Sequence, residues 1–448
     1  MNPRAASWGA AERALARDGV GRFVRPAWNG RALPSITASL LAATGHDAPD
    51  APVPLAPPLS ADLDPFHGGR AEGPIVLFLI DSLGWRSFRA AVERPTSESL
   101  APLANWAEHA APITTVFPST TTAAMTALST ATFPGRNGVV GHREFLPRWG
   151  VVADLLRMAP MTATGHDTLI GPGWLPRELT GTPTVFELGL SGCALSRDKF
   201  AGTAFTRLLY TGAEYCPYST ASDLAYELAL VLSRPRPPEV VFVYWDELDT
   251  SHHLRGPDQY LFDLEVDRLA HLVRAAALRV DPEVRRRVTL LVTGDHGQVA
   301  CPESANLPLE QHPALLQLMV HPPAGDRRAG FFALREGSES EFESRIRPLL
   351  PAESHYWRMD RAIEEHLFGP PPYHPEIKLR TGTFLAVPAQ PGGITYAAPG
   401  NPVPRRRFAG AHSGLEPEEM WVPLISGTLE ALTGPFPEPG SRAAADKT

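Results

Sequence analysis

Three stretches of the chain are apolar almost throughout and do not alternate apolar with polar positions. They span residues 75–80, 240–244 and 288–292, the last with one threonine. Continuous apolar runs of this length are typical of strands buried on both faces of a parallel sheet. Helical patterns lie between or beside them, at residues 98–110, 121–130, 222–233 and 259–277. The alternation predicts an α/β fold, with a mainly parallel central sheet and helices on both faces.

Changes in composition divide the chain further. Residues 1–74 form an N-terminal segment that ends in a connector rich in Pro and Ala. Gly, Pro and acidic residues set off residues 307–375, which predicts a small cap inserted into a core of residues 75–306 and 376–434. The strand pattern at residues 382–387 is expected to return the chain to the core. Residues 435–448 form a tail whose composition predicts disorder.

Charge and cysteine content exclude several classes of protein. Lys and Arg total 41 against 49 Asp and Glu, which gives a net charge of −8. This balance argues against binding of a nucleic-acid polymer, because such binding needs clustered positive charge. The three widely spaced cysteines predict neither a disulfide framework nor a Cys-x-x-Cys zinc site. No membrane span or signal-peptide core is evident, so a cytoplasmic protein is expected.

Each of the three apolar runs is followed by an acidic residue. Asp81 follows the first run, Asp249 lies in the segment after the second, and Asp295 follows the third. Ligands of open α/β sheets bind outside the carboxyl ends of the strands, so these acids are expected to converge. Closely spaced carboxylates repel one another unless cations lie between them. The pattern therefore predicts a cation site.

Histidines accompany these acids and indicate the kind of cation. His253 lies four residues after Asp249, His296 directly follows Asp295, and His412 lies in a glycine-bounded turn. Mixed oxygen and nitrogen donors suit Zn²⁺, while Mn²⁺ stays open for an oxygen-rich half-site. Three acids and three histidines are too many donors for one tetrahedral ion. Divided three and three, they suit two catalytic ions that each keep an open position.

A hydroxyl-rich segment supplies the predicted nucleophile. Residues 119–122 read Ser-Thr-Thr-Thr and lead from a strand end into the helix predicted at residues 121–130. A hydroxyl in a first helical turn lies near the positive end of the helix dipole, and contact with a metal ion lowers its pKa. Two cations, a helix N-terminus and an activated hydroxyl best match a small-molecule phosphate ester as the substrate.

In this order, the motifs resemble the alkaline phosphatase superfamily, in its type I phosphodiesterase/nucleotide pyrophosphatase branch. The resemblance spans about residues 75–425 and rests on the Thr-rich helix start before Phe133-Pro134, the Asp249/His253 pair, the Asp295-His296-Gly297 triplet and His412. It implies two zinc sites, one formed by Asp81, Asp295, His296 and the nucleophile, the other by Asp249, His253 and His412. Counting back from Phe133-Pro134 at the family's spacing implies Thr121 as the nucleophile.

Three departures from the family pattern bear on the nucleophile and the substrate. Phe117-Pro118 precedes Thr121, whereas the family often has Phe-Pro directly after its nucleophile, so Ser119 and Thr120 stay open as substitutes. His142 fills the position of the family's phosphate-binding Asn and is a candidate substrate contact.

The third departure concerns recognition of a nucleobase. The aromatic residue that often follows the nucleophile is replaced by Thr122, which leaves Tyr210 or Tyr215 as a candidate stacking face.

The sequence thus predicts a two-metal hydrolase that cleaves phosphodiester or pyrophosphate bonds through a phospho-threonine intermediate. Two alternatives use the same ligands: a phosphomonoesterase and a metal-dependent phosphosugar mutase. A third alternative, of another class, is a catalytically silent metal-binding protein.

Overall fold

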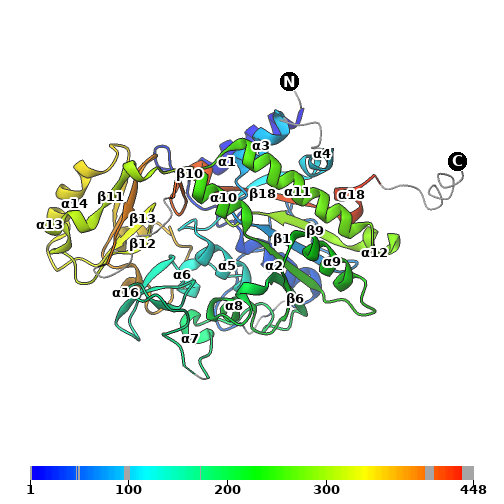
Figure 1. Ribbon diagram of the computed structural model, residues 1–448, viewed down its shortest axis with the longest axis horizontal. Helices are drawn as coiled ribbons and strands as arrows, with labels where there is room; N and C mark the ends of the chain where they lie inside the picture. Colours follow the sequence, from blue (N-terminus) through cyan, green and yellow to red (C-terminus); the bar gives the residue numbers. More distant parts are fainter. Residues whose placement is uncertain are drawn as a thin grey trace, which may run out of the picture.

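A seven-stranded sheet forms the centre of the molecule (Figure 1). The computed structural model describes residues 3–46, 48, 51–94, 101–171, 173–398 and 408–435. In spatial order the strands of this sheet are β2 (Ala110–Thr114), β18 (Trp421–Thr428), β9 (Thr289–Thr293), β1 (Ile75–Ile80), β8 (Val240–Trp245), β6 (Gly192–Arg197) and β7 (Glu214–Tyr218). The five strands from β9 to β7 pair in parallel, and β18 runs antiparallel to both of its neighbours. The mainly parallel sheet predicted from the sequence is confirmed.

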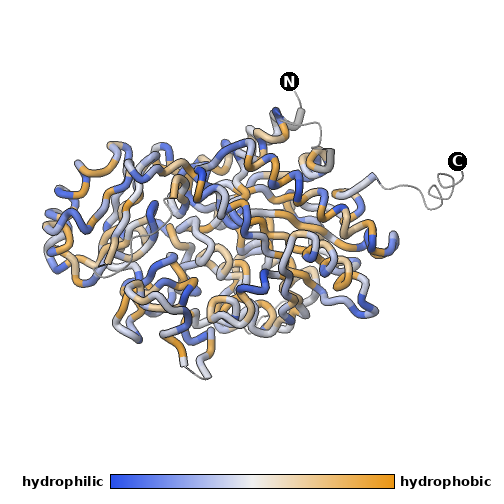
Figure 2. The backbone as a smooth tube through the Cα atoms, in the orientation of Figure 1, coloured by the Kyte–Doolittle hydropathy of each residue, from blue (hydrophilic) through white to orange (hydrophobic). Residues whose placement is uncertain are grey.

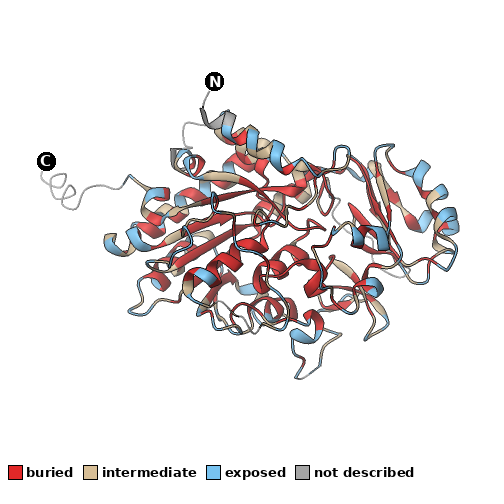
Figure 3. Cartoon of the chain, turned by 180° about the vertical axis from the view of Figure 1, so that it is seen from behind, coloured by how far each residue is buried: buried red, intermediate tan, exposed pale blue. Residues whose placement is uncertain are grey.

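Helices cover both faces of this sheet, which explains why its strands are apolar at every position. Successive side chains of β1 enter two different hydrophobic clusters, and all six are buried. The centre of the molecule is coloured as buried, and exposed segments lie toward its outside (Figure 3). One cluster includes residues of α3 (Trp85–Glu93), α4 (Ala101–Glu108), α9 (Ala221–Leu232), α10 (Glu247–Arg255), α11 (Gln259–Ala277) and α18 (Leu429–Thr433). The other includes residues of α2 (Pro34–Thr44), α5 (Thr121–Thr130) and α8 (Ala204–Tyr210). Hydrophobic residues follow the strands between these layers (Figure 2).

A second, antiparallel sheet lies at the end of the molecule that also carries α13 (Pro313–Leu316) and α14 (Glu339–Ile346) (Figure 1). In spatial order its strands are β14 (His355–Arg358), β15 (Phe384–Val387), β13 (Ala329–Phe332), β12 (Ala324–Asp326), β3 (Arg143–Leu146), β4 (Val151–Asp154) and β5 (Ala159–Pro160). Two distant parts of the chain therefore build this sheet together, one at residues 143–160 and the other at residues 324–387.

The strand predicted at residues 382–387 forms, but it belongs to the second sheet and not to the central one. As β15 it pairs with β13 and β14. Phe384 and Ala386 face one hydrophobic cluster, and Leu385 and Val387 face another. The apolar pattern records burial on both faces but does not say which sheet buries the strand, and that explains the error. The domain boundaries at residues 307 and 375 stay a prediction.

Further helices and two strand pairs complete the described architecture. They are α1 (Pro3–Leu15), α6 (Pro134–Asn137), α7 (Arg177–Thr180), α12 (Pro282–Arg287), α15 (Met359–Glu364), α16 (Ile377–Thr381), α17 (Pro417–Met420) and the strand pairs β10 (Val299–Ala300) with β17 (Gly410–Ala411) and β11 (Asn306–Pro308) with β16 (Gly393–Thr395). None of the helices in the described ranges is long and apolar enough to cross a membrane. Residues 98–100 of one predicted helix, and the predicted tail beyond residue 435, lie outside the described residues.

Candidate active site

Three acidic residues meet where neighbouring strands of the central sheet end. β1 lies between β8 and β9 and pairs with both in parallel, so the three carboxyl ends share one edge. Asp81 directly follows β1, Asp295 lies two residues after β9, and Asp249 lies in the first turn of α10, which follows β8. The structure thus brings together the three acids that the sequence singled out.

Asp81, Asp295 and His296 form a first group of donors. The Nε2 atom of His296 lies 3.5 Å from Oδ1 of Asp81 and 3.4 Å from Oδ2 of Asp295. These two carboxylate oxygens are buried and have no hydrogen-bond partner among the described residues. The other oxygen of each acid is held by the protein: the Tyr244 hydroxyl donates to Asp81, and the Ser82 N–H donates to Asp295 at 3.0 Å. The unpaired oxygens suit a cation, because a buried carboxylate without a partner is costly.

Asp249, His253 and His412 form a second group next to the first. The Nε2 atom of His253 lies 3.3 Å from Oδ1 of Asp249 and 3.2 Å from Nε2 of His412. The Gln298 amide donates to the same Asp249 oxygen at 2.8 Å. The rings of His412 and His296 stack with their centroids 3.7 Å apart, and donor atoms of Asp249, His296 and His412 lie within 4.8 Å of one another. The two groups therefore form one continuous site.

Backbone carbonyl groups fix the tautomer of all three histidines. The Nδ1 atoms of His253, His296 and His412 lie 3.1, 3.1 and 3.0 Å from the carbonyl oxygens of Gly410, Gly297 and Ser119. A carbonyl oxygen only accepts, so each Nδ1 carries a proton, and each Nε2 presents a lone pair when the ring is neutral. The Nε2 atoms of His253 and His412 face each other without a proton to share. Histidines that bind metal ions are oriented in this manner.

Burial and mutual repulsion shift the pKa values of these groups. Burial raises the pKa of Asp81 well above its usual range, and the charges of Asp295 and Asp249 raise it further. Burial also raises the pKa of Asp249 to about 7 and lowers that of His253 to about 4. The pKa of His412 lies well below its usual value, through burial and the neighbouring imidazoles. Buried carboxylates beside neutral imidazoles call for positive charge, which divalent cations supply.

The predicted nucleophile lies against the first group of donors. Thr121 is the first residue of α5, and its Oγ1 atom lies 3.1 Å from Nε2 of His296. Ser119, which the sequence left open, is buried and donates its hydroxyl to the carbonyl of Gly414 at 2.8 Å. Thr120, also left open, is only 2% exposed. This geometry favours Thr121.

Comparison with protein families identifies the chain. The family model described as type I phosphodiesterase/nucleotide pyrophosphatase matches residues 75–335, more than half of the sequence. The chain belongs to this family. The resemblance to the phosphodiesterase branch of the alkaline phosphatase superfamily, predicted from the motifs, is thereby confirmed. Members of this branch typically use two divalent metal ions, and the two donor groups are the candidate sites for them.

Solved structures show the same fold at low sequence identity. Inactive murine ectonucleotide pyrophosphatase/phosphodiesterase 5 in complex with AMP is 16% identical, with a TM-score of 0.56 over 79% of this chain and 87% of that one. Phosphonoacetate hydrolase from Sinorhizobium meliloti in complex with phosphonoformate is 14% identical, with a TM-score of 0.55 over 80% and 90% of the two chains. No curated protein matches the sequence. The α/β fold and the family together make this protein a phosphoester hydrolase of the phosphodiesterase/pyrophosphatase type.

The two substrate contacts predicted for this phosphodiesterase-family protein have different surroundings. His142 lies near the site, since its charge lowers the pKa of both His253 and His412. Tyr210 is not brought to the site. It is 8% exposed and lies in the hydrophobic cluster beneath the sheet, with its ring against Phe186. The side chain that was expected to offer a stacking face is a core residue, because α8 turns it inward.

The alternative aromatic residue, Tyr215, is also engaged within the protein. Its hydroxyl donates to the carbonyl of Arg197 at 2.6 Å, and its ring lies 6.4 Å from that of Tyr210.

The structure adds three side chains that the sequence analysis did not assign to the site. Tyr244 binds Asp81, and Gln298 binds Asp249. Phe408 is 44% exposed, and its ring lies 5.2 Å from that of His253. Tyr244 and Gln298 carried a signal, since Tyr244 is the last but one residue of the apolar strand β8 and Gln298 lies two residues after His296. Phe408 carried none, because its neighbours in the sequence say nothing of where its ring lies.

A buried ion pair joins the second sheet to the segment that carries His412. Arg328, in the turn between β12 and β13, donates to both carboxylate oxygens of Glu419 at 3.1 Å each. Both side chains are fully buried, and Glu419 also accepts the N–H of Gly414 at 2.9 Å. Bidentate pairing of this kind fixes geometry as well as adding energy. The second sheet therefore helps to position the site.

Proposed function

We propose that this protein is a two-zinc hydrolase that cleaves phosphodiester or pyrophosphate bonds through a phospho-threonine at Thr121. The proposal is carried by one observation: the Thr121 hydroxyl lies 3.1 Å from a histidine whose lone pair converges with unpaired carboxylate oxygens. A hydroxyl in this position can act as a nucleophile, because it faces the donor groups and does not cap the start of the helix.

The donor set fits two ions of the zinc type. Asp81, Asp295, His296 and Thr121 would hold one ion, and Asp249, His253 and His412 would hold the other. Carboxylate oxygens and neutral imidazole nitrogens are ligands that Zn²⁺ accepts, and the three protein ligands of the second group would leave an open position. When bound, such ions supply Lewis acidity to the phosphoryl oxygens and favour deprotonation of the threonine hydroxyl.

Thr121 carries out the two covalent steps. Its Oγ1 atom loses its proton to solvent and attacks phosphorus, so an Oγ1–P bond forms as the P–O bond to the leaving group breaks. A water molecule then attacks the same phosphorus, which breaks the Oγ1–P bond and returns the hydroxyl. Because Thr121 begins α5, negative charge on its oxygen and on the phosphoryl group develops at the positive end of a helix.

His142 supplies positive charge to the substrate phosphate. Its Nε2 atom lies 3.3 Å from Oδ2 of Asp154. Burial lowers the pKa of His142, but the Asp154 carboxylate outweighs burial, so the pKa is raised overall. The Thr122 hydroxyl donates to the carbonyl of Gly141 at 2.9 Å, which ties the residue before His142 to the start of α5. A cation held in this way stabilises phosphoryl oxygens in the transition state.

The type of ester is tested by comparing bis-p-nitrophenyl phosphate with p-nitrophenyl phosphate. We expect kcat/KM to be at least about tenfold higher for the diester, because a site that binds diesters also contacts the second ester group of the substrate. Faster cleavage of the monoester would instead identify a phosphomonoesterase, and a product that keeps its phosphate would identify a mutase. A protein that binds zinc fully but hydrolyses neither compound would be a metal-binding protein.

Replacing His142 with glutamine should raise KM for the diester about tenfold and change kcat much less, because a charge-assisted contact to phosphate is lost. In the unsubstituted protein the imidazolium is present below its raised pKa and is lost above it. KM should therefore increase with pH across the neutral range, and this increase should be absent from His142→Gln. Steady-state kinetics at several pH values provide the measurement.

The matched control is His321→Gln. The His321 ring stacks on Phe145 at 4.3 Å in the second sheet, so this variant should keep the KM and the pH profile of the original protein. A KM that does not change in His142→Gln would remove His142 from phosphate binding.

A further inference from the structure

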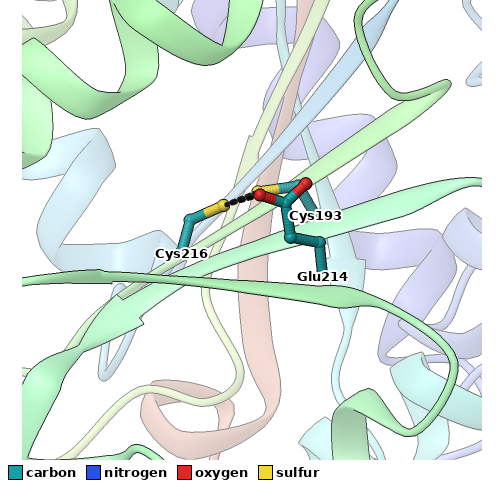
Figure 4. A group of neighbouring side chains, drawn as sticks. All are labelled: Cys193, Glu214 and Cys216. Atoms are coloured by element: carbon teal, nitrogen blue, oxygen red, sulfur yellow. Dashed lines mark hydrogen bonds between the residues drawn. The ribbon is translucent and has the colours of Figure 1, made fainter.

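Two of the three cysteines lie in contact on neighbouring strands of the central sheet (Figure 4). β6 and β7 pair in parallel, with Cys193 opposite Glu214 and Leu195 opposite Cys216. Residues two apart on a strand share a face, so both thiols enter the same hydrophobic cluster. The Sγ atoms are 2.6 Å apart. Neither donor group of the active site includes these cysteines, so the pair is a separate feature of the molecule.

The distance between the two sulfur atoms favours a bond between them over a shared metal ion. Two thiolates on one tetrahedral zinc ion, each about 2.3 Å from the metal, would lie about 3.8 Å apart. A disulfide bond is about 2.05 Å long. The observed 2.6 Å lies much closer to the disulfide than to the zinc arrangement.

A guanidinium group beside the pair also argues against a metal ion. Arg234 donates to both carboxylate oxygens of Glu214, at 2.7 and 3.0 Å, and one of its nitrogens lies 3.8 Å from Sγ of Cys216. This fixed positive charge neutralises Glu214 and would repel a further cation. The Glu214 carboxylate accepts a hydrogen bond from the Cys216 thiol at 3.4 Å and opposes its ionisation, whereas the Arg234 charge acts against that effect and favours the thiolate, which is the reactive form of cysteine.

The two thiols differ in access and in acidity. β7 is the edge strand of the sheet, and Cys216 is 6% exposed, whereas Cys193 is fully buried. The contact between the two thiols lowers the pKa of Cys216 and, together with burial, raises that of Cys193. Cys216 is therefore the outer, more acidic thiol, and Cys193 is the inner one.

We propose that Cys193 and Cys216 form a thiol–disulfide pair that is oxidised by low-molecular-weight disulfides. The Cys216 thiolate attacks one sulfur of the small disulfide, so a mixed disulfide forms and one small thiolate leaves. Cys193 then loses its proton and attacks Sγ of Cys216, which forms the Cys193–Cys216 bond and releases the second small thiol. The two cysteines lose two electrons and two protons in total, and the small disulfide gains them.

The test treats the purified full chain with oxidised glutathione and then titrates free thiols after denaturation. We expect three free thiols in the reduced protein to fall to one, with a mass loss of two hydrogens and a peptide that links Cys193 to Cys216. Three thiols that persist in the treated protein would overturn the proposal. So would two thiols that are protected until a chelator is added, since that result would identify a metal site.

Variants separate the attacking role of Cys216 from the resolving role of Cys193. In Cys193→Ala the reaction should stop at a glutathione adduct on Cys216, whereas the original protein should keep no such adduct. Arg234→Gln should slow oxidation several-fold, because the thiolate loses its neighbouring charge. Cys301→Ala is the matched control and should form the same disulfide at the same rate. Diester hydrolysis by each variant reports that it is folded, and a stable adduct on Cys216 in the original protein would contradict the role of Cys193.

Discussion

Replacing Thr121 with alanine should lower the turnover of phosphodiester hydrolysis by several orders of magnitude while zinc content stays near two ions per chain. The expected loss is large because the hydroxyl is the atom that bonds to phosphorus, so no other group takes over its step. Metal content should survive, because the three other donors of its group, Asp81, Asp295 and His296, remain in place. Rates on bis-p-nitrophenyl phosphate and elemental analysis of the same preparation provide the measurement.

Three further substitutions make this result specific. Thr121→Ser keeps a hydroxyl on the first residue of α5 and should recover much of the lost rate. Thr120→Ala and Ser119→Ala test the two residues that the sequence left open, and we expect both to keep turnover within about tenfold. Full activity in Thr121→Ala would reject Thr121 as the nucleophile. If in addition only Thr120→Ala or only Ser119→Ala lost activity, that residue would be the nucleophile instead.

Replacing His253 with alanine should reduce bound zinc from about two ions to about one per chain and lower turnover by more than about a hundredfold. The reason is that His253 provides one of three donors of the second group, which would keep only Asp249 and His412. Removing both ions from the original protein with a chelator should abolish hydrolysis, and added Zn²⁺ should restore it. Elemental analysis and diester hydrolysis before and after chelation check both expectations.

His252 provides the matched control on the same helix. It precedes His253, is buried, and stacks its ring on Phe262 at 6.3 Å. Neither of its ring nitrogens has a hydrogen-bond partner in the described part of the chain, so His252→Leu removes no contact of the site. This variant should retain two ions and near-normal turnover. Hydrolysis that resists complete removal of metal would contradict the two-zinc proposal.

Three inner strands of the central sheet could be predicted from the sequence because each is buried on both faces, whereas β2, β6 and β7 were not predicted. Burial of this kind leaves an uninterrupted apolar run, and β1, β8 and β9 lie where those runs predicted them. The second sheet was not readable, since its strands are short and come from residues 143–160 and 324–387. Pairing between segments so distant leaves no local pattern, which is why the sequence places β15 in the wrong sheet.

The candidate site was readable to the extent that its donors follow strand ends. Parallel strands carry their carboxyl ends to one edge, so the sequence alone places Asp81 and Asp295 together. It does not place Arg328 beside Glu419, because these partners are 91 residues apart and neither lies in a motif. The burial of Tyr210 could not be predicted from the sequence for a related reason, because the orientation of its side chain depends on how α8 packs against the sheet.

The order of residues by itself thus determined which strands are buried, which acids and histidines follow them, and which family the chain resembles, because these features are local or periodic. Only the tertiary structure decided which lone pairs converge, which hydroxyl lies against His296, and that two cysteines lie 2.6 Å apart. Those relations depend on the register and the packing of elements that meet in space, and a linear pattern does not encode distances between side chains from different strands.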